Sequence, residues 1–331
     1  MTLIITRTPL RISIGGGGTD LPSYYQENGG GFVISAAINK YVYITINRSF
    51  LPGYFLKYSE TEHADSCEAI RHPLLREAIR MHRAESPLEV VSVADVPAGT
   101  GLGSSGTFLV GVLHALYAWQ REPVTAEALA REAVEIEMNR LGEPVGKQDQ
   151  YIAAYGGLLC QEYLPDGEVH VAPLHMPEES LRELRDSLML FFVGETRSAS
   201  SLLGEQKRLS EAHDPGMIDS LHFARMLGRE IRRVLEAGQV SEFGRLMHEH
   251  WMRKRARARS MTTSRVDSLY DLARSEGGAS GGKLVGAGGS GFLLLHTQDR
   301  RRLRDTMLRA GLSEMDFSFD FDGSVVLLRN A

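Results

Sequence analysis

The sequence predicts an α+β protein built from two domains. Its 331 residues, of which 43% are hydrophobic and 24% charged, suffice for one large or two ordinary domains with buried cores. The first part alternates runs of β-branched and aromatic residues with glycine-rich breaks, whereas the later part holds long amphipathic stretches typical of helices. A strand-like run begins near residue 187, so we expect domains over residues 1–185 and 186–331.

The N-terminal domain is expected to begin with strands separated by glycines. A strand runs into a loop in "LIITRTPLRISIGGGGTDL", and a pair of strands comes after a glycine turn in "GGGFVISAAINKYVYITINRS". We then expect a helix over "SCEAIRHPLLREAIRMHR" and a strand over "LEVVSVADV". The next segment predicts a helix from residue 104 to about residue 119.

Helical patterns dominate the remainder of the chain. Thr125 is the expected N-cap of a helix over "TAEALAREAVEIEMNRL", and "GEPVGKQDQYIAAYGGLL" predicts a glycine-bounded loop that runs into a short helix. In the C-terminal domain, long amphipathic helices are expected over "DSLHFARMLGREIRRVLEAG" and "VSEFGRLMHEHWMRKRARARS". A glycine-rich segment, a helix and the final strand "GSVVLLRN" complete the prediction.

Composition narrows the class of protein. No apolar run reaches the roughly 20 residues that span a bilayer, and the first residues lack a signal-peptide pattern, so we expect a cytoplasmic protein without a membrane segment. Cys67 and Cys160 are far apart, which supports neither a disulfide framework nor a zinc site. The formal net charge of -5 argues against nucleic acid as a partner.

Two glycine-rich stretches come close to known nucleotide motifs. The segment "PAGTGLGSSG" contains G-x-G-x-x-G, but the region near Glu122 continues as a second helix, where a dinucleotide fold needs a second parallel strand. Residues 277–283 fit G-x-x-x-x-G-K, yet Leu284 occupies the position where a P-loop needs Ser or Thr. Both motifs therefore fail at a required feature.

The first of these stretches still has the chemistry of a phosphate cradle. Its glycines let the backbone approach a ligand, and a helix that begins at the serines presents free N–H groups whose dipole favours anions. A tight glycine turn capped by serine is the alternative. The residues are Gly99, Gly101, Gly103, Ser104, Ser105 and Gly106.

Four ionisable residues lie near such loops. Asp149 in "GKQDQ" could orient or deprotonate an attacking hydroxyl group, and Glu137 could hold magnesium together with the Ser105 hydroxyl. Arg11 and Asp20 flank a run of four glycines near the start of the chain. Each residue taken alone is equally compatible with an ordinary surface or loop position. Glycine-rich loops at the start, middle and end of the chain favour a shared site.

Three ordered segments carry a resemblance to a known family. "TPLRISIGGGGTDLPSYY", "VPAGTGLGSSG" and "GGKLVGAGGSGFLLL" resemble the three motifs of the GHMP small-molecule kinases. "GGGGTD", "HPLLREA", "GEPVGKQDQY" and "HEHW" are most similar to the branch that phosphorylates D-glycero-D-manno-heptose 7-phosphate. Galactokinases carry Gly-Glu-His-Thr-Asp in the first motif, which departs from the Gly-Gly-Thr-Asp found here.

The resemblance implies a fold and a set of site residues. The expected fold is an N-terminal domain like the second domain of ribosomal protein S5 and a C-terminal ferredoxin-like domain, with ATP and Mg²⁺ bound between them. Asp149 would be the catalytic base paired with Arg11, and Ser105 and Glu137 would bind the metal ion. ATP would be bound by Pro97, Gly99, Thr100, Gly101, Leu102, Gly103, Ser104, Ser105 and Gly106. Substrate would be bound by Gly17, Gly18, Thr19, Asp20, Gly288 and Gly289.

The implied reaction is transfer of phosphate from ATP to the anomeric hydroxyl of the heptose 7-phosphate, giving the 1,7-bisphosphate. The substrate's own phosphate requires a second basic pocket, for which Lys147 and Arg197 are expected, with the basic cluster over residues 253–259 as a further option. A galactokinase- or fucokinase-like kinase and a non-catalytic sugar sensor are the alternatives. Small molecules are the expected partners, and a homodimer is left open.

Overall fold

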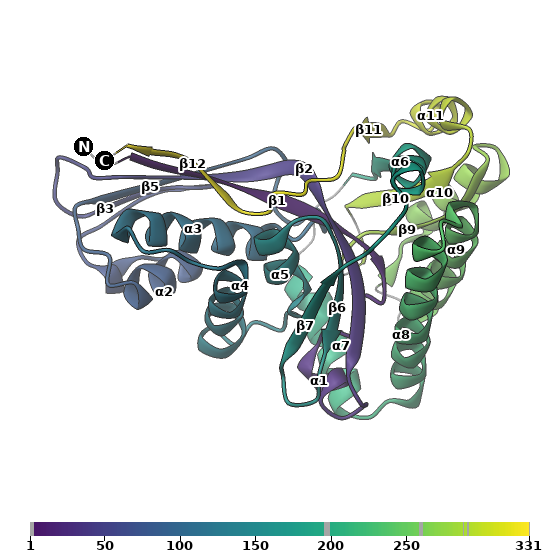
Figure 1. The fold of residues 1–331 in the computed structure, drawn as a ribbon, viewed down its shortest axis with the longest axis horizontal. Helices are drawn as coiled ribbons and strands as arrows, with labels where there is room; N and C mark the ends of the chain where they lie inside the picture. Colours follow the sequence, from purple (N-terminus) through teal and green to yellow (C-terminus); the bar gives the residue numbers. More distant parts are fainter. Residues whose placement is uncertain (1–2, 195–198, 258–260, 287, 290, 331) are drawn as a thin grey trace.

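Two β-sheets frame the molecule, and the computed structural model describes residues 3–194, 199–257, 261–286, 288–289 and 291–330 (Figure 1). Within these residues the larger sheet has eight strands in the order β12-β1-β2-β5-β3-β4, with β6 pairing β2 and β7. All described pairs in it are antiparallel except β3 with β5. The strands are β1 (Leu3–Gly15), β2 (Gly31–Asn47), β3 (Tyr54–Lys57), β4 (Thr61–Ala64), β5 (Leu88–Ala94), β6 (Leu158–Tyr163), β7 (Val169–Pro173) and β12 (Val325–Asn330).

Strand β2 corrects one prediction. The residues expected to form a pair of strands form one 17-residue strand, which pairs with β1 along most of its length and with two different strands on its other side. Residues 31–36 pair with β6, and residues 42–47 pair with β5. The register with β1 shifts between Pro9 and Leu10, so the long strand crosses from one part of the sheet to another without a turn.

Helices cover one face of this sheet (Figure 1). Helix α3 contacts β1 and β2, as its mostly buried, apolar sequence requires. The predicted helices from residue 104 and after the Thr125 N-cap are confirmed. The helices of this half are α1 (Pro22–Tyr25), α2 (Pro73–Met81), α3 (Ser104–Gln120), α4 (Ala126–Val134) and α5 (Gln148–Tyr155).

The helix expected over residues 66–83 is shorter in the structure. A 3₁₀ turn, η1 (Cys67–Ala69), precedes α2, and the two are separated by extended residues. Pro73 opens α2 because its ring disfavours a helical residue before it and its missing N–H is tolerated in the first turn. The His72 side chain accepts from Leu75 N and caps the helix.

The second sheet belongs to the later part of the chain. Its described strands are antiparallel in the order β11-β8-β10-β9, and the connections follow the β-α-β-β-α-β pattern of a ferredoxin-like domain. The strands are β8 (Leu188–Phe192), β9 (Ala279–Leu284), β10 (Phe292–Thr297) and β11 (Ser313–Met315). The helices are α6 (Glu178–Ser187), α7 (Ala199–Glu211), α8 (Pro215–Glu236), α9 (Val240–Arg257), α10 (Ser264–Ser275) and α11 (Arg300–Arg309).

Helix α8 joins the two halves. Its buried residues Leu227 and Ile231 belong to the same hydrophobic cluster as Ile12 of β1. A separate cluster, which includes Trp251 of α9 and Leu295 of β10, packs the second sheet against its helices. Strand β12 returns to pair with β1, so the last strand described lies in the first sheet. The division at residue 185 stays a prediction, with β12 crossing back over it. In the described residues, no helix is long and apolar enough to span a bilayer.

Candidate active site

A cleft of about 830 Å³ lies where the two halves meet. It is lined by residues from the first glycine run, the middle glycine loop, α5, α7, α9 and β9. These include Arg11, Ser13, Gly17, Gly18, Asp20, Pro97, Gly99, Gly101, Gly103, Ser104, Ser105, Glu137, Gln148, Asp149, Gln150, Leu203, Gln206, His250, Lys254, Lys283 and Gly286. Three sequence segments that lie far apart in the chain therefore share one cavity.

The middle loop ends at the start of α3. Gly99, Gly101 and Gly103 have φ values of +79°, +84° and +80°, a left-handed conformation that favours glycine. The first helical hydrogen bond runs from Thr107 N to Gly103 O at 3.0 Å, so the preceding N–H groups of α3 point out of the helix end. This geometry suits a phosphate group.

Ser104 does not cap this helix. A glycine turn capped by serine was the alternative to a phosphate cradle, but the N-cap is Gly103, in the left-handed conformation, and no side chain caps the helix. Ser104 is instead the first helical residue, and its buried hydroxyl has no hydrogen-bond partner among the described residues. The first N–H groups of α3 therefore receive no side-chain cap among the described residues.

The third glycine segment packs against the middle loop. A methyl group on Gly286 would lie 2.5 Å from Gly101 Cα, and one on Gly291 would lie 2.2 Å from Thr100 O. Glycine is therefore required at these contacts. Gly288 and Gly289 lie against Met261 and are not among the residues lining the cleft, so the structure does not bring these predicted substrate ligands into it.

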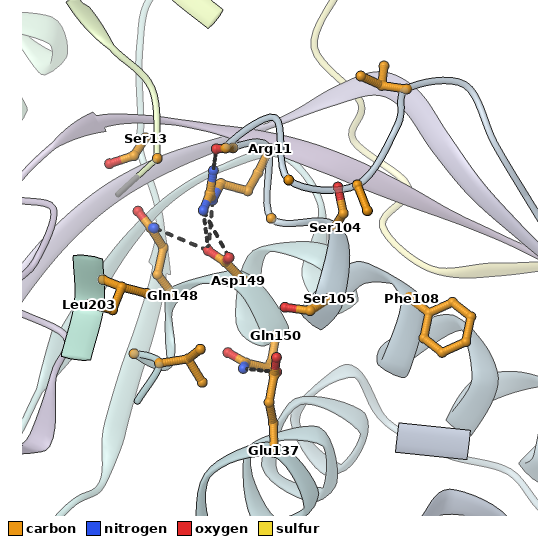
Figure 2. A pocket seen from close by; sticks show the side chains of 18 of the residues that line it. Arg11, Ser13, Ser104, Ser105, Phe108, Glu137, Gln148, Asp149, Gln150 and Leu203 are labelled. Atoms are coloured by element: carbon orange, nitrogen blue, oxygen red, sulfur yellow. Dashed lines mark hydrogen bonds and ion pairs between the residues drawn. The ribbon is translucent and has the colours of Figure 1, made fainter. Parts of the chain in front are cut away.

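Arg11 and Asp149 form a two-pronged ion pair (Figure 2). Arg11 Nε donates to Asp149 Oδ1 at 2.7 Å, and its terminal nitrogen donates to Oδ2 at 2.9 Å. The other terminal nitrogen donates to Gly101 O at 2.5 Å. This fork fixes the orientation of the carboxylate and ties it to the phosphate loop.

Glycines allow Asp149 to lie close to that loop. A methyl group on Gly106 would lie 2.9 Å from Asp149 Cβ, and one on Gly103 would lie 3.2 Å from its carboxylate. Gln148 Nε2 also donates to Asp149 Oδ1 at 3.2 Å. The carboxylate is thus held directly beside the N-terminus of α3, within reach of a group bound there.

Asp20 forms a second carboxylate position in the cleft. It accepts from Gly18 N at 3.1 Å and from Gln148 N at 3.3 Å. Burial raises its pKa, and the nearby Asp149 charge adds to the effect. Thr19 lies beside it but is fully buried and is not among the residues that line the cleft. Its hydroxyl lies 2.8 Å from Gly16 O and 2.9 Å from Phe32 O, so it shapes the loop.

Glu137 lies in a π-helical turn, η2 (Glu135–Arg140), that continues α4. Such turns are rare and concentrate at functional sites. Only 2% of Glu137 is exposed, and Gln150 Nε2 donates to its carboxylate at 2.6 Å (Figure 2). The nearby Ser105 hydroxyl interacts with the same carboxylate and opposes the rise of its pKa. Burial raises its pKa to about 7. The structure thus brings the two predicted metal ligands together.

These two residues fit a magnesium ion. Carboxylate and hydroxyl oxygens are hard donors, and Mg²⁺ is commonly held by one or two protein oxygens together with nucleotide phosphates and water. Burial raises the pKa of Glu137, and the groups that interact with its carboxylate to lower that pKa, Ser105 and Gln150, are neutral. A cation between this pair and the phosphate groups would compensate the charge of the carboxylate.

The predicted basic pocket is only partly placed. The Lys147 ammonium donates to Gly167 O at 2.5 Å and lies 5.2 Å from the Tyr25 ring centroid, and Lys147 is not among the residues lining the cleft. Arg197 lies outside the described residues. In the basic segment of α9, Arg253 is exposed and stacks on Phe223.

Three buried basic residues also line the cleft: His250 and Lys254 of α9, and Lys283 of β9. No role was predicted for His250 from the sequence, and Lys254 was included only as part of the basic cluster over residues 253–259. Lys283 ends the failed P-loop match and has no role in the sequence-based prediction beyond that motif. Lys254 belongs to a basic stripe, whose usual explanation is a solvated helix face. The four-residue spacing of His250 and Lys254 puts them on one face of the helix and was the available signal.

The cleft brings the outward-facing N–H groups at the start of α3 close to the Asp149 carboxylate. The first is a chemistry suited to anions and the second is a group able to accept a proton. That combination defines enzymes that transfer a phosphoryl group from a nucleotide to a hydroxyl acceptor. Residues 68–157 match the GHMP kinases N terminal domain, and residues 231–312 match the GHMP kinases C terminal domain. The chain belongs to the GHMP kinases and is an ATP-dependent phosphotransferase of that family.

Three relatives show how far the similarity extends. A D-glycero-alpha-D-manno-heptose 7-phosphate kinase of Campylobacter jejuni is 27% identical over 342 residues, covering 98% of both chains. A mevalonate kinase of Thermococcus sibiricus is 30% identical over 71% of this chain and 68% of its own. The crystal structure of a D-glycero-D-manno-heptose 1-phosphate kinase from Bacteriodes thetaiotaomicron has a TM-score of 0.80 and 27% identity, covering 99% of this chain and all of that one.

Proposed function

We propose that this GHMP kinase phosphorylates the anomeric hydroxyl of D-glycero-D-manno-heptose 7-phosphate and produces the 1,7-bisphosphate. Asp149 carries the proposal, because Arg11 holds its carboxylate directly beside the phosphate-binding end of α3. Full-length similarity to a heptose 7-phosphate kinase supports the choice of sugar.

In this mechanism the residues divide the work. Asp149 accepts the proton of the anomeric hydroxyl as that oxygen attacks the γ-phosphorus and ADP leaves. The N–H groups at the start of α3 stabilise the negative charge of the transferred group. Arg11 orients Asp149, and Asp20 accepts a hydrogen bond from a sugar hydroxyl.

Ser105 and Glu137 are the proposed ligands of Mg²⁺. The ion, when bound, neutralises charge on the β- and γ-phosphates. Glu137 supplies the charged oxygen, Ser105 supplies the hydroxyl oxygen, and Gln150 orients the carboxylate through its 2.6 Å hydrogen bond. Side chains that bind a metal ion are commonly oriented by hydrogen bonds from neighbouring residues that do not touch the metal, which is the role proposed for Gln150.

The deciding experiment is a kinase assay with a panel of sugars and sugar phosphates. The panel contains the heptose 7-phosphate, the same heptose without phosphate, galactose and fucose, and phosphorus NMR locates the new phosphate. We expect the 7-phosphate to be preferred and the product to carry phosphate at C1. Preference for an unphosphorylated sugar would favour the galactokinase- or fucokinase-like alternative, and sugar binding without turnover would favour a sensor.

A further inference from the structure

Lys254 of α9 has a buried ammonium group that ends on the third glycine segment. It is 8% exposed, and its Nζ donates to Leu284 O at 3.2 Å and to Gly286 O at 2.5 Å. A lysine is seldom buried to this extent, because removing an ammonium from water is costly unless polar groups face it. Here the ammonium faces two backbone carbonyls at the end of β9.

Those carbonyls belong to the segment that meets the phosphate loop. Gly286 packs against Gly101 so closely that a methyl group on either glycine would overlap the other segment. Gly101 O in turn accepts from Arg11 at 2.5 Å. Lys254 is therefore connected through one backbone contact to the loop expected to hold ATP.

The same contact leads to the catalytic pair. Arg11 binds Gly101 O with one terminal nitrogen and the two oxygens of Asp149 with its other nitrogens. A shift of the Gly101 carbonyl would move one anchor of the guanidinium. Because the guanidinium is rigid and planar, such a shift would also change the direction of the Asp149 carboxylate.

From these contacts we infer that Lys254 is a positioning residue for phosphoryl transfer. It holds Gly286 against Gly101 and so fixes the position of the phosphate loop relative to the Arg11–Asp149 pair. The inference rests on the proposed roles of that loop and that pair. It assigns to the C-terminal half of the chain a part in the chemistry, although the reacting groups lie in the N-terminal half.

Lys254→Met tests this role, because it keeps the length of the side chain and removes the donor. We expect kcat to fall about tenfold or more, and the Kd of a non-hydrolysable ATP analogue to rise about fivefold, since hydrogen bonds of charged groups are among the stronger ones. The KM of the sugar should stay within about twofold. Lys254→Arg retains donors for both carbonyls and should restore most of kcat.

The matched control is Arg245→Met, which removes an exposed cation from the same helix, where it pairs with Glu242 and Glu249. It should leave kcat and nucleotide affinity unchanged. Circular dichroism and the melting temperature are measured for each variant. If Lys254→Met does not fold, Lys254→Gln, which removes the charge and keeps a neutral amide NH2 donor, takes its place with the same expected direction.

Three results would overturn the inference. They are an unchanged kcat in a folded variant, a KM increase confined to the sugar phosphate, which would make Lys254 a direct substrate ligand, or failure of Lys254→Arg to recover activity. Nucleotide affinity is measured without any sugar. The Lys254 assignment is therefore tested even if the sugar panel contradicts the proposed substrate.

Discussion

Two carboxylates line the same cleft in opposite surroundings. The Asp149 side chain is 24% exposed and is held by the charged fork of Arg11, whereas Glu137 is almost fully buried and is held by the neutral groups of Ser105 and Gln150. The protein itself therefore supplies the cation for Asp149. For Glu137 the protein supplies hydrogen bonds from neutral groups but no cation among the described residues, and this supports its proposed role as a metal ligand.

The comparison is tested most severely by Asp149→Asn. The amide keeps the shape of the side chain but cannot accept the hydroxyl proton, so we expect kcat to fall about a hundredfold or more. Affinity for the ATP analogue should persist, because the N–H groups of α3 remain. Asp186→Asn, at an exposed position on α6, serves as the control. Undiminished turnover in the Asp149 variant would remove it from the role of base.

Arg11→Lys separates charge from geometry. Lysine retains the positive charge but cannot bind both Asp149 oxygens and Gly101 O in one plane, so we expect kcat to fall roughly 30-fold, corresponding to about 2 kcal/mol. Steady-state kinetics measures the effect. A variant with normal kcat would show that charge alone, and not the fork, maintains the carboxylate.

Glu137→Gln should affect metal dependence more than the chemical step. We expect the Mg²⁺ concentration for half-maximal rate to rise about tenfold, because the charged ligand is lost while the Ser105 hydroxyl remains. Activity is titrated with Mg²⁺ at saturating ATP. An unchanged titration would place the metal ion elsewhere, and the contrast between the two carboxylates would lose its functional meaning.

The last prediction concerns the pH dependence of stability and not turnover. The pKa of Glu137 is raised from its ordinary value of 4.5 to about 7, so the folded protein binds a proton between these values that the unfolded chain has released. Its contribution is fully present below about pH 4.5 and is lost as pH rises through about 7. The cost is about 3 kcal/mol, since one pKa unit is worth about 1.4 kcal/mol.

Urea unfolding of the metal-free protein at pH 5 and pH 8 measures this difference. The free energy of unfolding should fall with rising pH in the wild type and fall less in Glu137→Gln, which has no carboxylate to ionise. Added Mg²⁺ should stabilise the wild type more at pH 8 than at pH 5, because the metal ion and the proton compete for one oxygen. Equal slopes in both proteins would assign the effect to other groups.

Local signals in the sequence predicted much of the first half. The helix from residue 104 and the Thr125 cap are confirmed, because both depend on neighbours a few residues apart. The pair of strands expected over residues 31–47 was wrong, because these residues form one strand. The change of partner from β6 to β5 within that strand depends on distant residues and has no local sequence signal. The GHMP kinase fold is confirmed, but it was predicted from resemblance, which periodicity alone could not have supplied.

The candidate site was predictable where glycines and carboxylates stand in recognisable loops. Arg11, Glu137 and Asp149 were expected to share a site, and the structure brings them to one cleft. Lys254 was expected only as a member of the basic cluster over residues 253–259, because its contact with the third glycine segment depends on packing between α9 and β9. The π turn at Glu137 was also hidden, since its residues are ordinary helix formers. The roles of all these residues stay predictions.

The pairing of β1 with β12 has a consequence for the order of folding. Leu3 lies opposite Asn330, so a strand made at the start of synthesis acquires this neighbour only after the whole second sheet has been translated. Domains usually fold in order from the N-terminus during synthesis. In this chain the edge of β1 stays open in the meantime, and an unpaired strand edge invites pairing with other chains. We therefore expect misassembly to be most frequent among unfinished chains that are being translated close together on the same messenger RNA.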